Sequence, residues 1–433
     1  MSDSRRILGL CLGLLGVLWF WAAPGLVSSN DGSHLALSRA LLRGETALGE
    51  DVALTLWVDR SRLSGVDYSD RPPGTALLAA PAVALGSALD PALFEASREA
   101  KEVMVQPAAP RYVQTYMARV QRMRRRAPPL VTLQGTALML AVHCAAMGVF
   151  GVMGVVLLLR RRELSVPAQV FAGMTLGVGC LWGPYSIVLF SHVSAGALAV
   201  WAVLGLEAGI GRIAEDGSWP AVHRWPLLGA GLAAGWASSV DYLVGLLVLG
   251  VGLCAVPPKR WLAAAPWVVL GALPILAATF AYHDAAFGSP LSIGYDHHAN
   301  FEFARERSST FSGNALGGAW SLWGLGQGAG VLALAPVMLV GVLGLAAHAE
   351  RRWLLGALPW IVLLAMHRTP TGGAGEDHRY LVPLMPLLAV GLGLAWQRWA
   401  QGSKSARWVA AALVVLALVS AWLSWSHTLP TWG

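Results

Sequence analysis

Two polar stretches, Ser28-Ser29-Asn30-Asp31-Gly32 and Tyr68-Ser69-Asp70-Arg71-Pro72-Pro73-Gly74-Thr75, lie between the first two long apolar runs of the chain. The first stretch directly follows the apolar run 7–27, and the next long run begins near residue 131. A segment of about a hundred residues thus places carboxylates and a proline-fixed arginine beside a candidate membrane span. This order predicts a membrane protein with one long loop after its first helix.

Composition supports the same class. Of 433 residues, 56% are hydrophobic and only 13% are charged, whereas an ordinary soluble domain has about a quarter of its residues charged. The apolar runs are about 15 to 29 residues long, and runs of that length cross a bilayer as helices that satisfy their own backbone. The alternation of a barrel strand does not occur in them. We therefore predict an all-α polytopic membrane protein.

About eleven transmembrane helices are expected from the apolar runs. Two of these runs are Gly-rich and shorter than the roughly 20 residues of a straight span, so we expect them to be tilted, re-entrant or sheltered by neighbours. The first run could alternatively be a cleaved signal peptide, although its length favours retention. The predicted spans are 7–27, 131–159, 166–186, 191–211, 225–239, 243–256, 262–282, 326–347, 353–368, 380–397 and 407–424.

Basic residues predict the orientation of these spans. With a cytoplasmic N-terminus, one side receives most of the basic turns, which is the pattern expected for the cytoplasmic face. The apolar stretch 74–89 must then be an interfacial or re-entrant helix, because a span there would invert every later loop. The basic residues on the predicted cytoplasmic side are Arg5, Arg6, Arg160, Arg161, Arg162, Arg212, Arg224, Lys259, Arg260, Arg351, Arg352, Arg398, Lys404 and Arg407.

The outer side then carries three segments, 28–130, 283–325 and 368–379. Arg122, Arg124, Arg125 and Arg126 lie on that side, where anionic lipid headgroups would attract them. The net charge of +7 follows from the basic turns and this cluster, so no nucleic-acid partner is predicted. The four cysteines lie inside apolar runs without disulfide or zinc spacing, as small core residues do.

Asp31 and Arg71 are the two outer residues with the clearest chemical potential. A carboxylate at position 31 lies near headgroup depth, but taken alone Asn30 or Asp31 is better explained as the cap of a helix over 33–42. Pro72 and Pro73 present the Arg71 guanidinium from a stiff extended segment, which suits it to clamp a phosphate. The alternative is an arginine that snorkels beside a proline turn.

The order of these features resembles the GT-C membrane glycosyltransferases, in particular the protein O-mannosyltransferases, the lipid A aminoarabinose transferases and similar bacterial proteins. The resemblance covers most of residues 5–400, and the order of the motifs carries more weight than any one of them. The further matching stretches are Trp182-Gly183-Pro184-Tyr185-Ser186, Phe190-Ser191-His192, Asp241-Tyr242, Phe287-Gly288-Ser289-Pro290-Leu291, Gly294-Tyr295 and Asp377-His378-Arg379-Tyr380-Leu381-Val382-Pro383.

The resemblance implies an inverting glycosyltransferase that moves a sugar from a polyprenyl-phosphate donor to an acceptor hydroxyl or amine. Asp31 would be the catalytic base, and Arg71 would replace the usual lysine that holds the donor phosphate. Two departures stand out: His192 occupies the place of a second acid, and Asp241-Tyr242-Leu243 replaces Glu-Tyr-Pro. The implied substrate-binding residues are Arg71, Asp70, Asp67, His192, Asp241, Arg379 and Tyr380.

The same resemblance predicts a catalytic module at 1–283 and a variable membrane module at 284–433. The expected location is the bacterial inner membrane with a periplasmic active face, and the expected partners are the lipid donor, membrane lipids and an unidentified acceptor. No cofactor is expected; Asp296, His297, His298 and Glu302 have ligand types for a metal, but a solvated loop is favoured. A transporter, or a non-catalytic lipid-binding or assembly protein on the same scaffold, remains the alternative.

Overall fold

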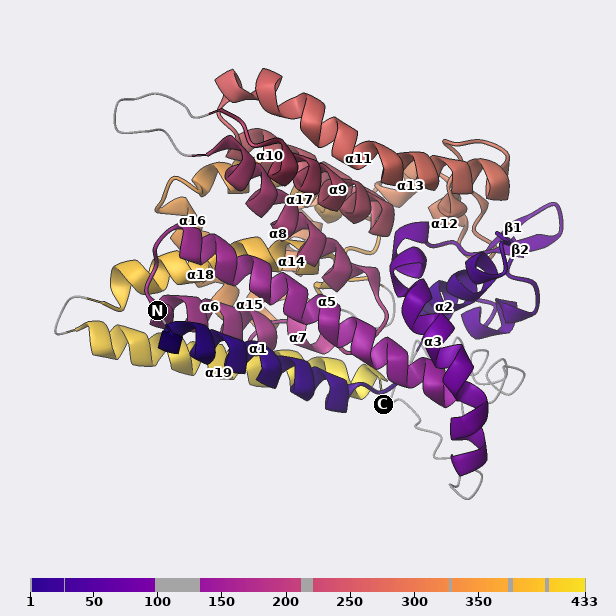
Figure 1. Cartoon of the computed structure of the whole chain (residues 1–433), viewed down its shortest axis with the longest axis horizontal. Coiled ribbons are helices and arrows are strands. Elements are labelled where there is room, and N and C mark those ends of the chain that lie inside the picture. Colours follow the sequence, from indigo (N-terminus) through magenta and orange to yellow (C-terminus); the bar gives the residue numbers. More distant parts are fainter. Residues whose placement is uncertain are drawn as a thin grey trace.

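The computed structural model describes residues 2–26, 28–97, 133–211, 221–326, 329–372, 377–401 and 405–432. In these ranges the protein is a bundle of helices with a single two-stranded hairpin (Figure 1). The helices of the bundle are α1 (Ser2–Ala22), α5 (Gln134–Arg161), α6 (Val166–Val178), α8 (Ser191–Ile210), α9 (Arg224–Val240), α10 (Tyr242–Ala255), α11 (Pro258–Phe287), α16 (Val337–Ala346), α17 (Arg351–Ala365), α18 (Met385–Trp399) and α19 (Ala406–Trp432).

The bundle confirms the predicted all-α, multi-pass membrane class. Six of the described helices are long and apolar enough to cross a bilayer: α1, α5, α8, α11, α18 with the 3-10 turn η7 (Arg379–Leu384) before it, and α19. Each predicted span coincides with a helix. Helices α6, α10 and α16 are shorter, so the predicted number of eleven crossings stays a prediction.

Two predicted continuous spans are interrupted. The span expected at 166–186 ends its helix at Val178 and resumes as the short α7 (Trp182–Tyr185). The span expected at 326–347 divides into α15 (Val331–Leu334) and α16. Pro336 lies at this second break, where it has no N–H to donate to the helix ladder, and Ala335 before it is not helical (φ −145°, ψ 53°).

A small module built from the predicted outer segments lies at one end of the bundle, on the right in Figure 1. The apolar stretch 74–89 forms part of its helix α3, which packs alongside α5. Arg122, Arg124, Arg125 and Arg126 lie outside the described residues. The elements of this end are α2 (Ser29–Leu42), the 3-10 turn η1 (Gly49–Thr55), β1 (Ser61–Leu63), β2 (Val66–Tyr68), α3 (Pro73–Ser97), the 3-10 turn η4 (Gly294–His297), α12 (Glu302–Arg305) and α13 (Arg307–Thr310). Helix α14 (Ala315–Trp323), which completes the predicted outer segment 283–325, instead packs against α17 of the bundle.

Three of the turns predicted to be cytoplasmic meet elsewhere, around Arg162. Its Nη2 lies 2.6 Å from Glu207 Oε1, and its Nε lies 2.8 Å from Glu350 Oε1. The guanidinium also lies 5.0 Å from the centre of the Trp353 ring. These contacts place the end of α5, the end of α8 and the start of α17 on one side, as the basic-residue pattern predicts. Which side faces the cytoplasm stays a prediction.

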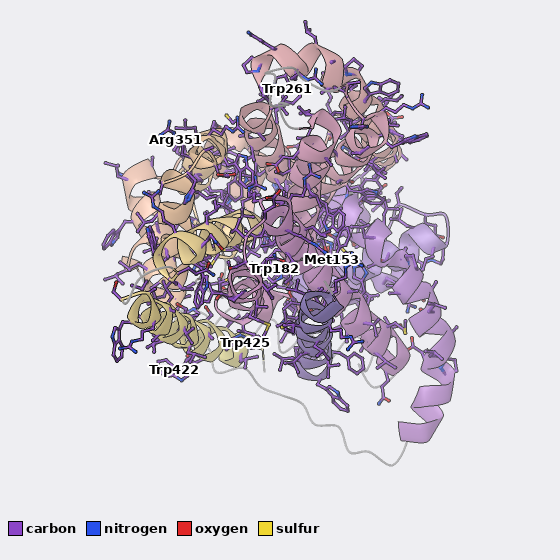
Figure 2. All side chains as sticks on the ribbon, turned by 60° about the vertical axis from the view of Figure 1, so that its left-hand side comes forward. Met153, Trp182, Trp261, Arg351, Trp422 and Trp425 are labelled. Carbon is purple, nitrogen blue, oxygen red and sulfur yellow. The ribbon has the colours of Figure 1, made fainter. Side chains whose placement is uncertain are left out.

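One hydrophobic core runs through the bundle and contains residues of both predicted modules, from Leu8 of α1 to Leu413 of α19. Trp182 and Trp360 are buried at its centre, whereas Trp422 of α19 is 69% exposed. Figure 2 shows Trp182 inside the bundle and Trp422 on its outer surface. Exposed apolar side chains of this kind suit contact with lipid tails. The proposed boundary at residue 283 stays a prediction.

Candidate active site at the hairpin end of the bundle

Asp31 lies in the first turn of α2 and is fully buried. The helix begins at Ser29, and Ser28 is its N-cap: the Ser28 hydroxyl accepts from the backbone N–H of Asn30. In turn, the Asp31 Oδ1 accepts hydrogen bonds from the Ser28 backbone N–H at 2.9 Å and from the Ser28 hydroxyl. The predicted cap by Asn30 or Asp31 is therefore wrong: Ser28 caps the helix, and Asp31 completes a capping box.

Arg71 lies just after β2, and Pro73 begins α3 two residues later. Its Nη2 lies 2.9 Å from Asp59 Oδ1, and its Nε lies 3.4 Å from Asp70 Oδ2. Nη1 takes part in neither pair. Burial opposes the charge of Arg71, but Asp70 and Asp59 together hold its pKa well above the ordinary value. The result is an arginine whose position is fixed by two carboxylates.

Asp70 is the more deeply buried of these carboxylates, at 1% exposure. Burial alone would raise its pKa, but Arg71, His298 and the Ser33 hydroxyl outweigh that effect and hold the pKa below the ordinary value. The Ser33 hydroxyl of α2 donates to Asp70 Oδ1 at 3.2 Å. Asp70 therefore stays ionised and ties Arg71 to α2.

Asp59 is a member of the site that the sequence prediction missed. Leu56 and Trp57 before it both have positive φ, 50° and 53°, which is rare for residues with side chains and turns the chain sharply. Asn300 holds this turn, since its Nδ2 donates to Trp57 O and Val58 O at 2.8 Å. Asp59 accepts from the Ser29 hydroxyl at 2.5 Å as well as pairing with Arg71. One carboxylate thus joins the first turn of α2 to Arg71.

A close backbone contact brings the Arg71 segment to the membrane helices. A Cβ added to Gly74 would lie 2.4 Å from the carbonyl carbon of Ser239 at the end of α9, so only glycine fits there. Asp241 follows on the same turn and caps α10, accepting from Leu243 N at 3.0 Å. The charge of Arg71 acts electrostatically on Asp241.

His192, Asp241 and Tyr380 also lie together. The His192 Nδ1 is 3.8 Å from Asp241 Oδ2, and the centres of the His192 and Tyr380 rings are 5.7 Å apart and nearly perpendicular. The charges of Arg379 and Arg71 both act on His192. Three of the predicted substrate-binding residues, from three distant parts of the sequence, therefore lie close enough to Arg71 for electrostatic interaction: His192, Asp241 and Tyr380.

Arg379 is held by a neighbour of its own motif. Asp377 Oδ1 accepts from the backbone N–H of Arg379 at 2.9 Å, and Asp377 Oδ2 accepts from the Tyr185 hydroxyl at 2.7 Å. The Arg379 and Tyr185 side chains also interact with each other. Tyr185 and Asp377 thus act as a support for Arg379 that the sequence prediction had not assigned to the site.

Asp67 has different surroundings from the other predicted site residues. It lies on β2 and forms an ion pair with Arg60 and, at 3.8 Å, with Arg62 of β1. These contacts belong to the hairpin. The described contacts of Asp67 therefore fit a structural role in the hairpin better than contact with a substrate.

The described residues with metal-ligand types converge at Asp59, Asp70 and His298, whose ligand atoms all lie within 4.8 Å of one another. His298 Nδ1 accepts backbone N–H groups from Asn300 and Phe301, both at 3.1 Å. Hydrogen bonding therefore assigns the proton to Nε2, which lies 3.5 Å from Asp70 Oδ2. A protonated nitrogen is not a metal ligand, and Arg71 already supplies a positive charge. The cluster fits a buried ion-pair network better than a metal.

The loop that carries His298 packs closely against the segment that follows β2. A Cβ on Gly294 would lie 2.8 Å from the carbonyl oxygens of Ser69 and Asp70, which explains a glycine at that position. The other predicted metal-ligand types have partners of their own: Asp296 Oδ2 accepts from Ile293 N, and His297 Nε2 pairs with the Ser292 hydroxyl. His298 of this loop and Ser33 of α2 thus contact different carboxylate oxygens of Asp70.

Comparison with solved structures shows a GT-C fold, the fold of a class of membrane glycosyltransferases. A crystal structure of ArnT from Cupriavidus metallidurans bound to undecaprenyl phosphate matches 99% of this chain and 76% of its own, with a TM-score of 0.56 and 15% identity. The apo form of that ArnT, a lipid A aminoarabinose transferase, matches 100% of this chain and 76% of its own, with a TM-score of 0.49 and 15% identity. No protein-family model and no curated protein match the chain. The fold predicted from the resemblance is confirmed.

Proposed function

We propose that this protein is an inverting glycosyltransferase that takes a sugar from a polyprenyl-phosphate donor and transfers it to an acceptor hydroxyl or amine. The reaction would take place at the outer headgroup level of a bacterial inner membrane. The observation that carries the proposal is Arg71, held between Asp59 and Asp70 at one end of a GT-C bundle. One solved ArnT structure with the same fold is bound to undecaprenyl phosphate.

The Arg71 guanidinium is the proposed cation that binds the phosphate of the lipid donor. Asp59 and Asp70 engage Nη2 and Nε of Arg71, so the guanidinium is oriented before a ligand arrives, and Nη1 is left for a phosphate oxygen. Arginine binds phosphate through parallel charge-assisted hydrogen bonds. The charge of a second half-buried arginine, Arg379, acts on His192, as that of Arg71 does. Two cations can therefore offset the charge that grows on the departing phosphate.

Asp31 is the proposed base. In a single displacement, the acceptor oxygen attacks the anomeric carbon, the bond from that carbon to the phosphate oxygen breaks, and the phosphate leaves with the electron pair. The acceptor proton passes to the carboxylate of Asp31. The first turn of α2 is linked to Arg71 through Ser29 and Asp59, which supports base and phosphate cation acting on one substrate. One displacement inverts the anomeric centre.

The test compares Arg71 with Arg62 of the neighbouring hairpin in purified protein. Native mass spectrometry measures binding of undecaprenyl phosphate, and a membrane assay measures transfer of a radiolabelled sugar from its glycosylated form. Arg71→Ala should weaken phosphate binding at least about tenfold, as expected when a charged hydrogen bond is lost. Arg62→Ala is the matched control, because the Arg62 side chain is 54% exposed and its ion pair among the described residues is with the hairpin carboxylate Asp67 at 3.8 Å. Equal binding by both variants would refute the proposed role of Arg71.

A further inference from the structure

His34 is a buried histidine of α2 that lacks a hydrogen-bond partner within the described part of the chain. Its exposure is 1%, and neither Nδ1 nor Nε2 is bonded. A buried polar atom without a partner costs about 1–3 kcal/mol. A histidine that served only to fill the core would be replaced by an apolar residue at no loss.

Two other buried histidines each have at least one hydrogen-bonded ring nitrogen. In His283, Nε2 is 2.7 Å from the Tyr242 hydroxyl, and Nδ1 is 3.1 Å from Pro290 O. The Nδ1 of His378 lies 2.8 Å from Ala329 O. His34 therefore differs from these two histidines in offering both nitrogens.

The surroundings of His34 are those of the proposed site. Ser33, the residue before it, bonds to the Ser69 and Asp70 side chains at 2.9 and 3.2 Å. The charges of Arg71 and Asp70 act on the His34 ring. Asp31 lies three residues earlier on α2, a spacing that places two side chains on one helix face. His34 thus shares a helix face with the proposed base and lies within electrostatic reach of the proposed phosphate cation.

Three other buried polar atoms also have no hydrogen bond to any described residue: Thr75 Oγ1, His192 Nδ1 and Tyr282 Oη. The charge of His34 would act on His192, and that of Asp70 acts on Tyr282. Burial, with Arg71 beside it, lowers the pKa of His34 to about 3, so the ring is neutral. A neutral imidazole offers one donor and one acceptor.

We propose that His34 is a substrate-binding residue that hydrogen-bonds a hydroxyl of the donor sugar next to the phosphate. A hydroxyl is a donor and an acceptor at once, which matches a neutral imidazole. A phosphate offers acceptors only, and Arg71 already suits it. This inference rests on the proposed function. It assigns recognition of the sugar to His34 and binding of the phosphate to Arg71.

The experiment uses His34→Phe, with His283→Phe as the matched control. Native mass spectrometry of the full-length variants in detergent measures dissociation constants for undecaprenyl phosphate and for its forms carrying one glucose, mannose or 4-amino-arabinose. For at least one sugar, His34→Phe should weaken binding of the glycosylated lipid about tenfold relative to the bare lipid phosphate. An unchanged ratio for all three sugars would overturn the inference.

Thermal unfolding separates this role from a structural one. Since Phe removes two unpaired polar atoms, the Tm of His34→Phe should equal or exceed that of the wild type, whereas His283→Phe breaks two hydrogen bonds and should lower it. A fall in Tm for His34→Phe as large as for His283→Phe would also overturn the inference. Wild-type protein that fails to bind undecaprenyl phosphate would instead refute the proposed function, and this inference with it.

Discussion

Replacing Asp31 by asparagine separates catalysis from helix capping, the two roles that its position allows. The asparagine side chain keeps an oxygen that can accept from Ser28 N, the contact that Asp31 makes at 2.9 Å, so α2 should still begin at residue 29. Loss of the negative charge near the helix N-terminus costs about 0.5 kcal/mol. Because asparagine cannot act as a general base, Asp31→Asn should lower turnover at least about a hundredfold. Binding of undecaprenyl phosphate should stay near the wild-type value.

The matched variant is Ser28→Ala. It removes the hydroxyl that bonds to Asn30 N and to Asp31 but keeps the carboxylate, and it should cost about 1 kcal/mol of stability as a lost N-cap. The two variants therefore rank in opposite order: Ser28→Ala is the less stable, and Asp31→Asn is by far the less active. The assays are thermal unfolding and radiolabelled sugar transfer with equal amounts of folded protein. Similar transfer rates in the two variants would show that Asp31 is only a capping residue.

Three further results are expected. Asp59→Asn should weaken binding of undecaprenyl phosphate less than Arg71→Ala, because Arg71 keeps its contact with Asp70; native mass spectrometry showing no change would remove Asp59 from the site. The lowered pKa of His34, about 3 in the folded protein against 6.5 in the unfolded chain, gives stability that is present above pH 6.5 and is lost as pH falls toward 3. The Tm of His34→Phe should therefore decline less over that range, and parallel curves would contradict the neutral buried ring. Arg162→Met leaves Glu207 and Glu350 without their cation and should cost about 3 kcal/mol, with activity per folded molecule unchanged; an unchanged Tm beside an Arg160→Met control would count against that network.

The fold was predictable because the length of an apolar run is a local property of the sequence. Each of the predicted spans corresponds to a helix, and the class follows from run length and charge alone. The break at Pro336 carried a visible signal, since proline interrupts a helix ladder, yet the surrounding run is apolar enough to mask it. The break after Val178 lies among glycines whose effect depends on packing.

The site was only partly predictable because its members meet through tertiary contacts. Arg71 and Asp241 were identified from proline chemistry and from the membrane edge. Asp59 was not, since its place depends on two residues with positive φ and on a side chain at position 300, far away in the sequence. His34 has no motif at all: its lack of partners becomes visible only when α2 is packed.

The central claim is that a polyprenyl phosphate binds at Arg71. Electron cryomicroscopy of the protein in lipid nanodiscs with undecaprenyl phosphate tests it most directly, because phosphate density locates the headgroup without assuming an activity. The expected result is phosphate density in hydrogen-bond contact with the Arg71 guanidinium, with Asp31 and His34 facing the place where the sugar would be attached. Phosphate bound elsewhere, with Arg71 still engaged only by Asp59 and Asp70, would contradict the account.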